Sequence, residues 1–165
     1  MPWSLVLILL MALALRILVV IPPAIDWDES WVGVGAMNVL KGVFPPFFYG
    51  QPYMASLEDF LHALVFAGAG PARWSLKVVP VILAVVFVYL AFRVAFRIFD
   101  GEAAYAVALV AAFPPPQMVS WTVSARLHYS LTPVLGVLFL LVAVEVMIRP
   151  EARRPARWFV LGLLS

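Results

Sequence analysis

The chain of 165 residues is 65% hydrophobic and 12% charged, whereas soluble domains are closer to half apolar and a quarter charged. A soluble fold of this length could not bury so much apolar surface, so we expect lipid to solvate much of the chain. The net charge of +2 is too small to indicate a nucleic-acid partner, and the lack of cysteine excludes disulfides, thiolate zinc sites and cysteine nucleophiles. The expected fold class is all-α: a polytopic transmembrane helix bundle of about four or five spans, forming a single domain over residues 1–165.

The first predicted span is the apolar run from Leu5 to Ile21, which Pro22 and Pro23 close. A signal peptide would need basic residues before the run and a small-residue cleavage site after it, and the sequence has neither. We therefore expect an uncleaved first helix. Arg16 lies near its far end, close enough for the side chain to snorkel to the interface.

Residues 22–77 predict a long external loop that lies at one membrane surface, because five of the nine acidic residues of the chain fall there. Two short helices are expected within this loop. The first runs from Ser30 to Lys41 and ends at Gly42, a suitable residue for a helix C-terminus. The second begins at Ser56, whose hydroxyl can cap it, with Asp59 in the capping-box position.

The second short helix is predicted to be amphipathic, and to rest on the membrane surface or dock against the bundle. Glu58, Asp59 and His62 lie away from its apolar face, where we expect an ordinary polar face and no metal site. The apolar face comprises Leu57, Phe60, Leu61, Leu64, Val65 and Gly68. Between the two helices, the segment from Phe44 to Tyr53 is too rich in proline to be helical. Its aromatic residues could stack on a sugar or a lipid chain, or pack at the interface.

Three further apolar segments complete the predicted bundle. Val78 to Ile98 is long enough to span, and so is Leu131 to Ile148. Ala103 to Phe113 is short, so we expect this helix to continue, kinked, through three prolines toward Trp121. A basic stretch over residues 149–157 precedes a last apolar run.

The basic residues predict the orientation of the chain. Arg93 and Arg97 flank one short loop, and four arginines crowd the loop at 149–157, on the same side of the membrane by the count of spans. Loops rich in Lys and Arg face the cytoplasm. We therefore expect a multi-pass protein of the plasma membrane with a cytoplasmic N-terminus, and with loop 22–77 and segment 114–130 together outside.

The most informative motif is Asp26-Trp27-Asp28-Glu29, directly after the first helix. Three carboxylates in four residues repel one another and raise their proton affinity. Such a cluster can hold a cation or supply a general base. The alternative is that Asp28 caps the helix starting near Ser30 while the other acids are solvated, and both interpretations stay open on spacing alone.

A second candidate group lies between the third and fourth spans, on the same predicted side as the acids. Arg126 and His128 could bind a phosphate, whereas the alternative is that Arg126 and Tyr129 anchor the chain at the interface. The sequence contains no glycine-rich phosphate loop and no nucleophile-elbow motif.

Three features together resemble the GT-C membrane glycosyltransferases, which include the protein mannosyltransferases and the lipid A aminoarabinose transferases. One is the acidic pair Asp28-Glu29 after the first span, and another is the proline-ended helix at residues 111–114 with the following residues 120–129. The third is the segment Tyr49 to Glu58, followed by an amphipathic helix and Gly70-Pro71. The resemblance covers nearly the whole chain through loose patterns.

The resemblance implies transfer of a sugar from a polyprenyl-phosphate donor to a glycan, lipid or protein acceptor on the outer face, with inversion at the anomeric carbon. Asp28 would take the proton of the acceptor hydroxyl, and Glu29 would orient the acceptor or assist. Arg126 would neutralise the departing phosphate. The remaining candidate substrate-binding residues are Asp26, Tyr53, Glu58, His128 and Tyr129. Asp26-x-Asp28 also resembles the metal-binding pair of the oligosaccharyltransferase branch, but most lipid-phosphate-sugar enzymes need no metal, so we expect neither metal nor cofactor.

Two other classes remain open. A small transporter or channel subunit would place ionisable groups inside its spans, whereas here the spans carry almost none apart from Arg16, Arg93 and Glu145, which lie toward the ends. A non-catalytic membrane scaffold would leave the acid cluster merely solvated. Because GT-C enzymes are several times longer, we expect the chain to be an N-terminal fragment that is inactive alone.

Overall fold

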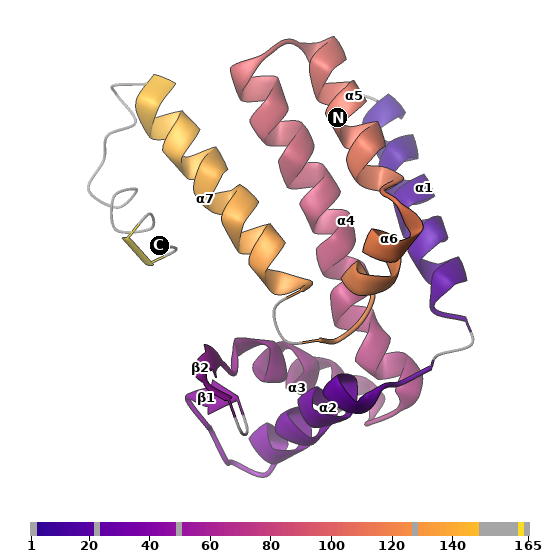
Figure 1. The fold of residues 1–165 in the computed structure, drawn as a ribbon, viewed down its shortest axis with the longest axis vertical. Helices are drawn as coiled ribbons and strands as arrows, with labels where there is room; N and C mark the ends of the chain where they lie inside the picture. The colour runs from indigo at the N-terminus through magenta and orange to yellow at the C-terminus, as the bar shows by residue number, and fades with distance from the viewer. Residues whose placement is uncertain (1–2, 22–23, 49–50, 127–128, 149–161, 164–165) are drawn as a thin grey trace.

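The computed structural model describes residues 3–21, 24–48, 51–126, 129–148 and 162–163, with side chains undescribed at 51–53. These residues form seven helices and a two-stranded hairpin (Figure 1). The elements are α1 (Trp3–Val19), α2 (Trp27–Leu40), β1 (Phe47–Phe48), β2 (Gln51–Ala55), α3 (Leu57–Ala69), α4 (Arg73–Ile98), α5 (Gly101–Ala112), α6 (Pro116–Thr122) and α7 (Leu131–Ile148).

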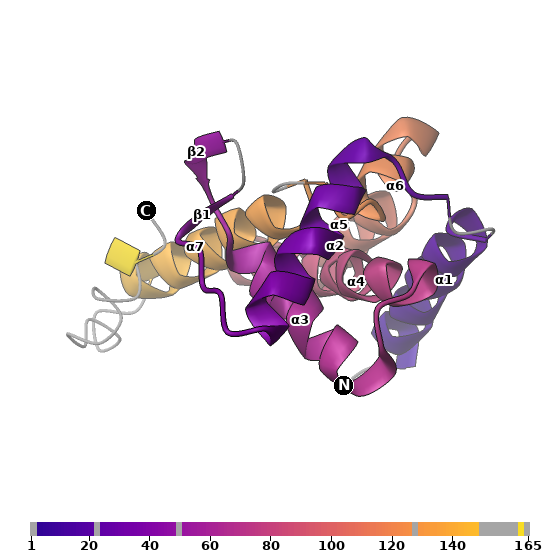
Figure 2. The ribbon, with the colours of Figure 1, turned by 90° about the horizontal axis from the view of Figure 1, so that it is seen from below.

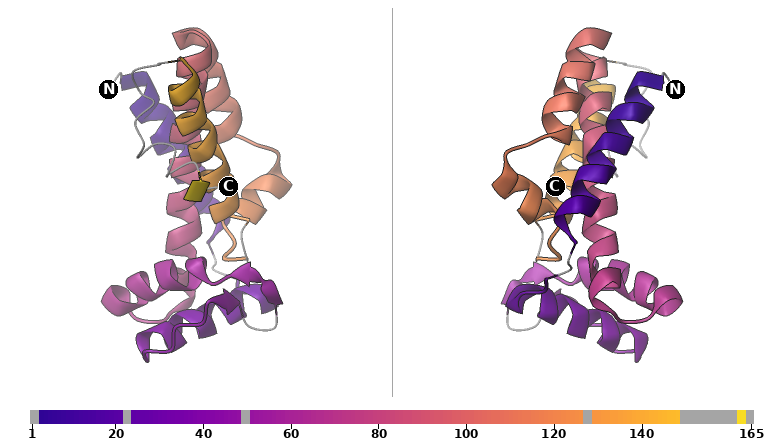
Figure 3. Two further views of the ribbon diagram at one scale, coloured as in Figure 1. Left: turned by 90° about the vertical axis from the view of Figure 1, so that its left-hand side faces the viewer. Right: turned by 90° about the vertical axis from the view of Figure 1, so that its right-hand side faces the viewer.

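Helices α1, α4, α5 and α7 lie side by side, and α2 and α3 lie across one end of this bundle (Figures 1 and 3). Helix α4 is central and contacts the other three bundle helices. Seen from below, α2 and α3 form a separate layer over the end of the bundle (Figure 2). Two helices of the described chain, α4 and α7, are long and apolar enough to cross a membrane, while α1 and α5 are apolar but shorter.

Small side chains allow α1 and α5 to pack closely on α4. Ala104, Ala108 and Ala112 recur every fourth residue on α5, and all three are fully buried with Ala12 of α1 and Val88 of α4. Side chains at this spacing share one helix face. Alanine on that face lets two backbones approach closely, which is the usual contact between helices in lipid.

The helix predicted at Leu131–Ile148 is confirmed with the same bounds. Helix α4 begins at Arg73 rather than Val78, so the predicted loop 22–77 extends five residues too far. The reason lies in Ser75, whose hydroxyl accepts a hydrogen bond from the Ala72 amide at 2.8 Å and stabilises the first turn.

The kinked, continuous helix predicted between residues 103 and 121 is wrong, because α5 ends at Ala112 and α6 is a separate helix. Proline has no amide hydrogen and clashes with the preceding turn, so three consecutive prolines end α5. The last of them, Pro116, occupies the first position of α6, where proline is tolerated.

The prediction that Arg16 snorkels to the interface is also wrong. Its side chain is 1% exposed and donates hydrogen bonds to the carbonyl oxygens of Ala111 at 3.1 Å and Ala112 at 2.5 Å. The last carbonyls of a helix have no partner within the helix. Arg16 of α1 therefore satisfies the end of α5 that the prolines create.

The segment between α2 and α3 is stabilised by backbone hydrogen bonds and by the hydroxyl group of Ser56. Gly42 has a φ of 83° directly after the end of α2, as expected. Strands β1 and β2 pair in an antiparallel hairpin, which confirms a non-helical segment, although strand pairing was not predicted. Ser56 makes no capping bond and donates instead to the carbonyl of Pro45, so the predicted capping box with Asp59 is wrong.

Helix α3 has the two predicted faces, but the polar one points inward. Glu58, Asp59 and His62 are buried against α2 and α4, while Leu64 on the apolar face is 73% exposed. The expected ordinary polar face of Glu58, Asp59 and His62 is therefore a buried polar layer. Close approach is possible because Gly35 of α2 stands opposite Asp59.

Gly35→Ala is expected to lower the free energy of unfolding by about 1–3 kcal/mol, the usual cost of overpacking a core. A Cβ atom at Gly35 would lie 2.3 Å from Oδ2 of Asp59, whereas one at Gly33 would lie 3.8 Å from Leu76. Gly33→Ala is the matched control and should be neutral or stabilising by up to about 1 kcal/mol. Thermal unfolding in detergent micelles compares the two, and equal effects would contradict the close contact.

Candidate functional site

The acid cluster forms the N-terminus of α2, where Asp26 and Glu29 make a capping box. Oδ1 of Asp26 accepts a hydrogen bond from the Glu29 amide at 3.0 Å, and Oε2 of Glu29 accepts one from the Asp26 amide at 3.2 Å. This arrangement satisfies two amides that a helix start leaves unpaired. The alternative that Asp28 caps the helix is therefore wrong, because Asp26 is the cap.

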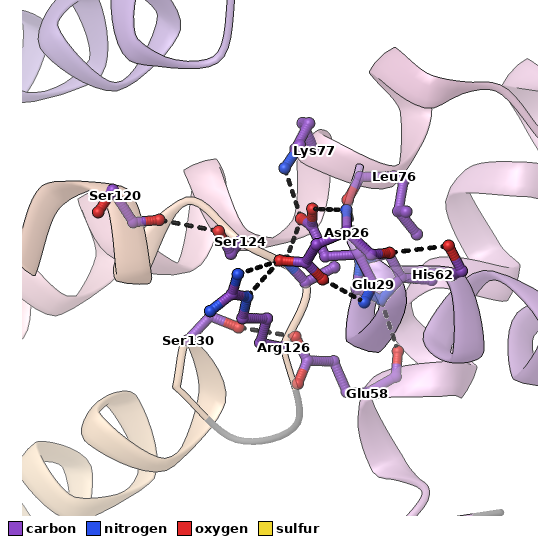
Figure 4. A network of polar contacts seen from close by, with 12 residues as sticks. Asp26, Glu29, Glu58, His62, Leu76, Lys77, Ser120, Ser124, Arg126 and Ser130 are labelled. Atoms are coloured by element: carbon purple, nitrogen blue, oxygen red, sulfur yellow. Dashed lines mark hydrogen bonds and ion pairs between the residues drawn. The ribbon is translucent and has the colours of Figure 1, made fainter. Parts of the chain in front are cut away.

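Glu29 also connects three parts of the chain that are distant in sequence (Figure 4). Its side chain is 2% exposed, and Nζ of Lys77 on α4 lies 2.5 Å from its Oε1. The same oxygen accepts a hydrogen bond from the Ala125 amide at 2.8 Å. Glu29 thus holds α2, α4 and the segment before α7 together, with both carboxylate oxygens engaged.

The second ion pair of the site joins Asp26 to Arg126 (Figure 4). Partial burial alone would raise the pKa of Asp26, but hydrogen bonds from the Glu29 amide and from Arg126 outweigh it and hold that pKa below its usual value. The same hydrogen bond raises the pKa of Arg126 above its usual value, because it stabilises the charged guanidinium. Both groups therefore stay charged at neutral pH.

Asp28 differs from its two neighbours. Its side chain is exposed, and it makes no hydrogen bond or ion pair with any residue that the structure describes. It lies close enough to Arg126 for its charge to raise the pKa of that guanidinium. Two carboxylates of the cluster are thus paired with Arg126 and Lys77, and Asp28 is left as the exposed carboxylate of the three.

The segment that leads into α7 is fixed by acids of the α2–α3 layer. Ala125 binds Glu29 and Arg126 binds Asp26, as described above. The hydroxyl of Ser130 donates a third hydrogen bond, to Oε1 of Glu58 at 2.7 Å. Tyr129 is exposed and its ring lies 5.5 Å from that of Trp121. Ala125, Arg126 and Ser130 thus meet the α2–α3 layer at one end of the bundle (Figure 1), and the predicted position of segments 22–77 and 114–130 outside the membrane stays a prediction.

The predicted site residues are brought together only in part. Asp26, Glu29 and Arg126 meet directly. Glu58, on α3, contacts Ser130 further along the segment that contains Arg126, and Tyr129 lies in that segment beside Trp121. His128 and the side chain of Tyr53 fall outside the described residues, so both remain predictions. Among the described residues, no group of three or more His, Asp or Glu could hold a metal ion.

Two cavities of about 300 Å³ each lie on opposite sides of the short helix α6. One has a mixed lining, in which Val19, Val20, Ala24, Ile25 and Val123 stand beside Asp26, Glu29, Lys77, Ser120, Ser124 and Arg126. The other is apolar, and its walls include Ala84, Phe87, Ala111, Met118, Trp121 and Pro133. Arg16 lines the apolar cavity, and its Nε atom has no hydrogen-bond partner among the described residues.

The sequence interpretation missed Lys77, which supplies the second cation of the site. The available signal was a lone cation at the start of an apolar span, on the same side as the acids. Comparison with models of protein families, with curated proteins and with solved structures found no match to this chain.

Proposed function

We propose that the chain is part of a multi-pass glycosyltransferase of the plasma membrane that transfers a sugar from a polyprenyl-phosphate donor to an acceptor hydroxyl on the outer face. The observation that carries the proposal is the pair of cavities beside α6. An apolar cavity lies next to one that is lined by Asp26, Glu29, Lys77 and Arg126, in which the guanidinium of Arg126 is partly exposed. This pair suits a ligand with a hydrocarbon chain and an anionic head that Arg126 can contact. The acceptor is a glycan, a lipid or a protein.

The surface of the bundle supports a position in lipid. Helix α7 is apolar along its length, yet few of its side chains are buried in the protein. Exposed Trp74, Trp121 and Tyr129 lie toward the end where α2 and α3 lie, and aromatic side chains of this kind mark a membrane interface. Arg93 and Arg97 lie at the opposite end of α4, which faces the cytoplasm in this proposal.

The proposed reaction is a single displacement with inversion. Asp28 takes the proton from the acceptor hydroxyl, and the hydroxyl oxygen forms a bond to the anomeric carbon. The bond between this carbon and the phosphate oxygen breaks, and its electrons leave with the polyprenyl phosphate. Arg126, whose side chain is partly exposed, offsets the charge of the leaving phosphate through guanidinium donors that Asp26 does not occupy. Glu29 assists by fixing Lys77 and the Ala125 backbone in place.

Ala111→Leu is expected to lower transfer from a polyprenyl-phosphate sugar about tenfold, the effect of losing roughly 1.4 kcal/mol of donor binding. The larger side chain would occupy the apolar cavity, which Ala111 lines. Ala106→Leu places the same side chain on an exposed position of the same helix and should leave transfer unchanged. The assay uses membranes that contain the complete gene product. If both variants transfer sugar equally well, the apolar cavity does not bind the donor. Absence of transfer in all samples would overturn the proposed function.

A further inference from the structure

A buried layer of ionisable side chains lies on the inner face of α3, apart from the proposed reaction. Asp59 faces Gly35 of α2, His62 faces Leu76 in the first turns of α4, and Glu58 points to Ser130 before α7 (Figure 4 shows Glu58 and His62). Each of the three is at most 4% exposed. Buried ionisable groups are costly unless they are paired or neutral, so their protonation states decide how well this layer packs.

Asp59 has the least favourable surroundings of the three. Neither of its carboxylate oxygens has a hydrogen-bond partner among the described residues. Gly35 of α2 packs directly against the carboxyl group, where even a Cβ atom would be too close. Burial, and then the charge of Glu58, raise the pKa of Asp59 to about 7.

His62 bridges two backbone carbonyl oxygens. Its Nδ1 lies 2.9 Å from the Glu58 carbonyl oxygen and its Nε2 lies 3.1 Å from the Leu76 carbonyl oxygen. A carbonyl oxygen only accepts hydrogen bonds, so the ring of His62 offers no acceptor and no spare donor to Asp59 while it makes these contacts.

The charged groups on the neighbouring elements make no ion pair or hydrogen bond with Asp59 among the described residues. Lys77 of α4 is bound to Glu29 of α2. Arg126, in the segment before α7, is bound to Asp26. Ser130 donates its hydroxyl hydrogen to Glu58. The remaining charged groups of the first turns of α2 and α4, Asp28 and Arg73, are exposed at the surface.

We infer that Asp59 is a proton-binding site whose occupancy holds α3 against α2. With the proton bound, the Asp59 carboxyl group is uncharged and α3 packs closely on Gly35. Loss of the proton leaves a carboxylate that no donor of the described residues reaches, and hydration of this group requires α3 to separate from α2. The inference concerns the docking of the layer and does not depend on sugar transfer.

The chain contains no cysteine, so a single introduced thiol can report the separation. Ala63→Cys places the thiol on the buried face of α3, and Leu64→Cys places it on the exposed face as the reference for thiol ionisation. The ratio of the two maleimide labelling rates is expected to rise about tenfold between pH 6 and pH 8, because the ionised fraction of a group with a pKa near 7 rises about tenfold over this range.

The same measurement in two further backgrounds tests the assignment to Asp59. In Asp59→Asn the ratio is expected to stay constant, and in Glu102→Gln, which changes an exposed acid of α5, the tenfold rise should remain. Infrared spectra supply a second readout. The carbonyl band of a protonated carboxylic acid should disappear between pH 6 and pH 8 in the wild type, and Asp59→Asn should lack it. A constant ratio in the wild type, an unchanged rise in Asp59→Asn, or a band that survives this substitution would each overturn the inference.

Discussion

Asp28→Asn is expected to reduce sugar transfer about 100- to 10,000-fold, the usual contribution of a general base. The amide has nearly the same shape as the carboxylate but cannot take a proton from the acceptor hydroxyl. The substitution should leave the fold intact, because the Asp28 side chain is exposed and bonds to no described residue. Transfer from a polyprenyl-phosphate sugar, in membranes that contain the complete gene product, measures the effect.

Glu102→Gln is the matched control for this substitution. Glu102 is also an exposed acid two residues after the cap of its helix, at the opposite end of the bundle. Both substitutions remove the same favourable interaction with a helix N-terminus, worth about 0.3–1 kcal/mol. Full activity of Asp28→Asn would remove Asp28 from the mechanism, as a non-catalytic scaffold requires. An equal loss in both variants would point to expression or folding.

Glu29→Ala is expected to lower the free energy of unfolding by about 3–5 kcal/mol, the cost of removing one partner from a buried ion pair. Lys77 would keep its charge in a buried site without an anion. The amides of Asp26 and Ala125 would also lose their acceptor. This large effect follows because one side chain joins α2, α4 and the segment before α7. Thermal unfolding in detergent micelles provides the measurement.

Two controls separate the buried pair from ordinary surface charge. Glu145 pairs with Arg97 at 2.8 Å in a more exposed position, so Glu145→Ala should cost about 1 kcal/mol or less. Replacing both Glu29 and Lys77 by Met should recover much of the stability, because no buried charge then lacks a partner. A loss below about 1 kcal/mol for Glu29→Ala, or a double variant as unstable as the single one, would contradict the assignment.

The sequence predicted the long apolar helices well, because length and hydropathy suffice to recognise them. Helix α7 begins and ends at the predicted residues. The start of α4 was misplaced because it depends on the hydroxyl of Ser75, a single hydrogen bond that hydropathy does not detect. The inward direction of Arg16 likewise depends on the carbonyls of α5, almost a hundred residues away.

The two capping motifs show why local patterns were insufficient for the site. Asp26 and Glu29 have the spacing of a capping box and form one. Ser56 and Asp59 have the same spacing and form none, because the Ser56 hydroxyl binds Pro45 and Asp59 faces Gly35. Tertiary contacts made this difference. The sequence predicted only that Arg126 and the acid cluster lie on the same side of the membrane, and did not predict their ion pair. Lys77 was not predicted as a site residue at all.

The hydrogen bonds that hold residues 125–130 also impose an order on biogenesis. Ala125 and Arg126 bind acids about a hundred positions earlier in the chain, and Ser130 binds Glu58. Closing contacts over such long separations is slow compared with forming local helices. During synthesis, α2 and α3 emerge well before α7 and are available as a template. The final position of α7 is therefore set late, by docking onto a part of the chain that is already folded.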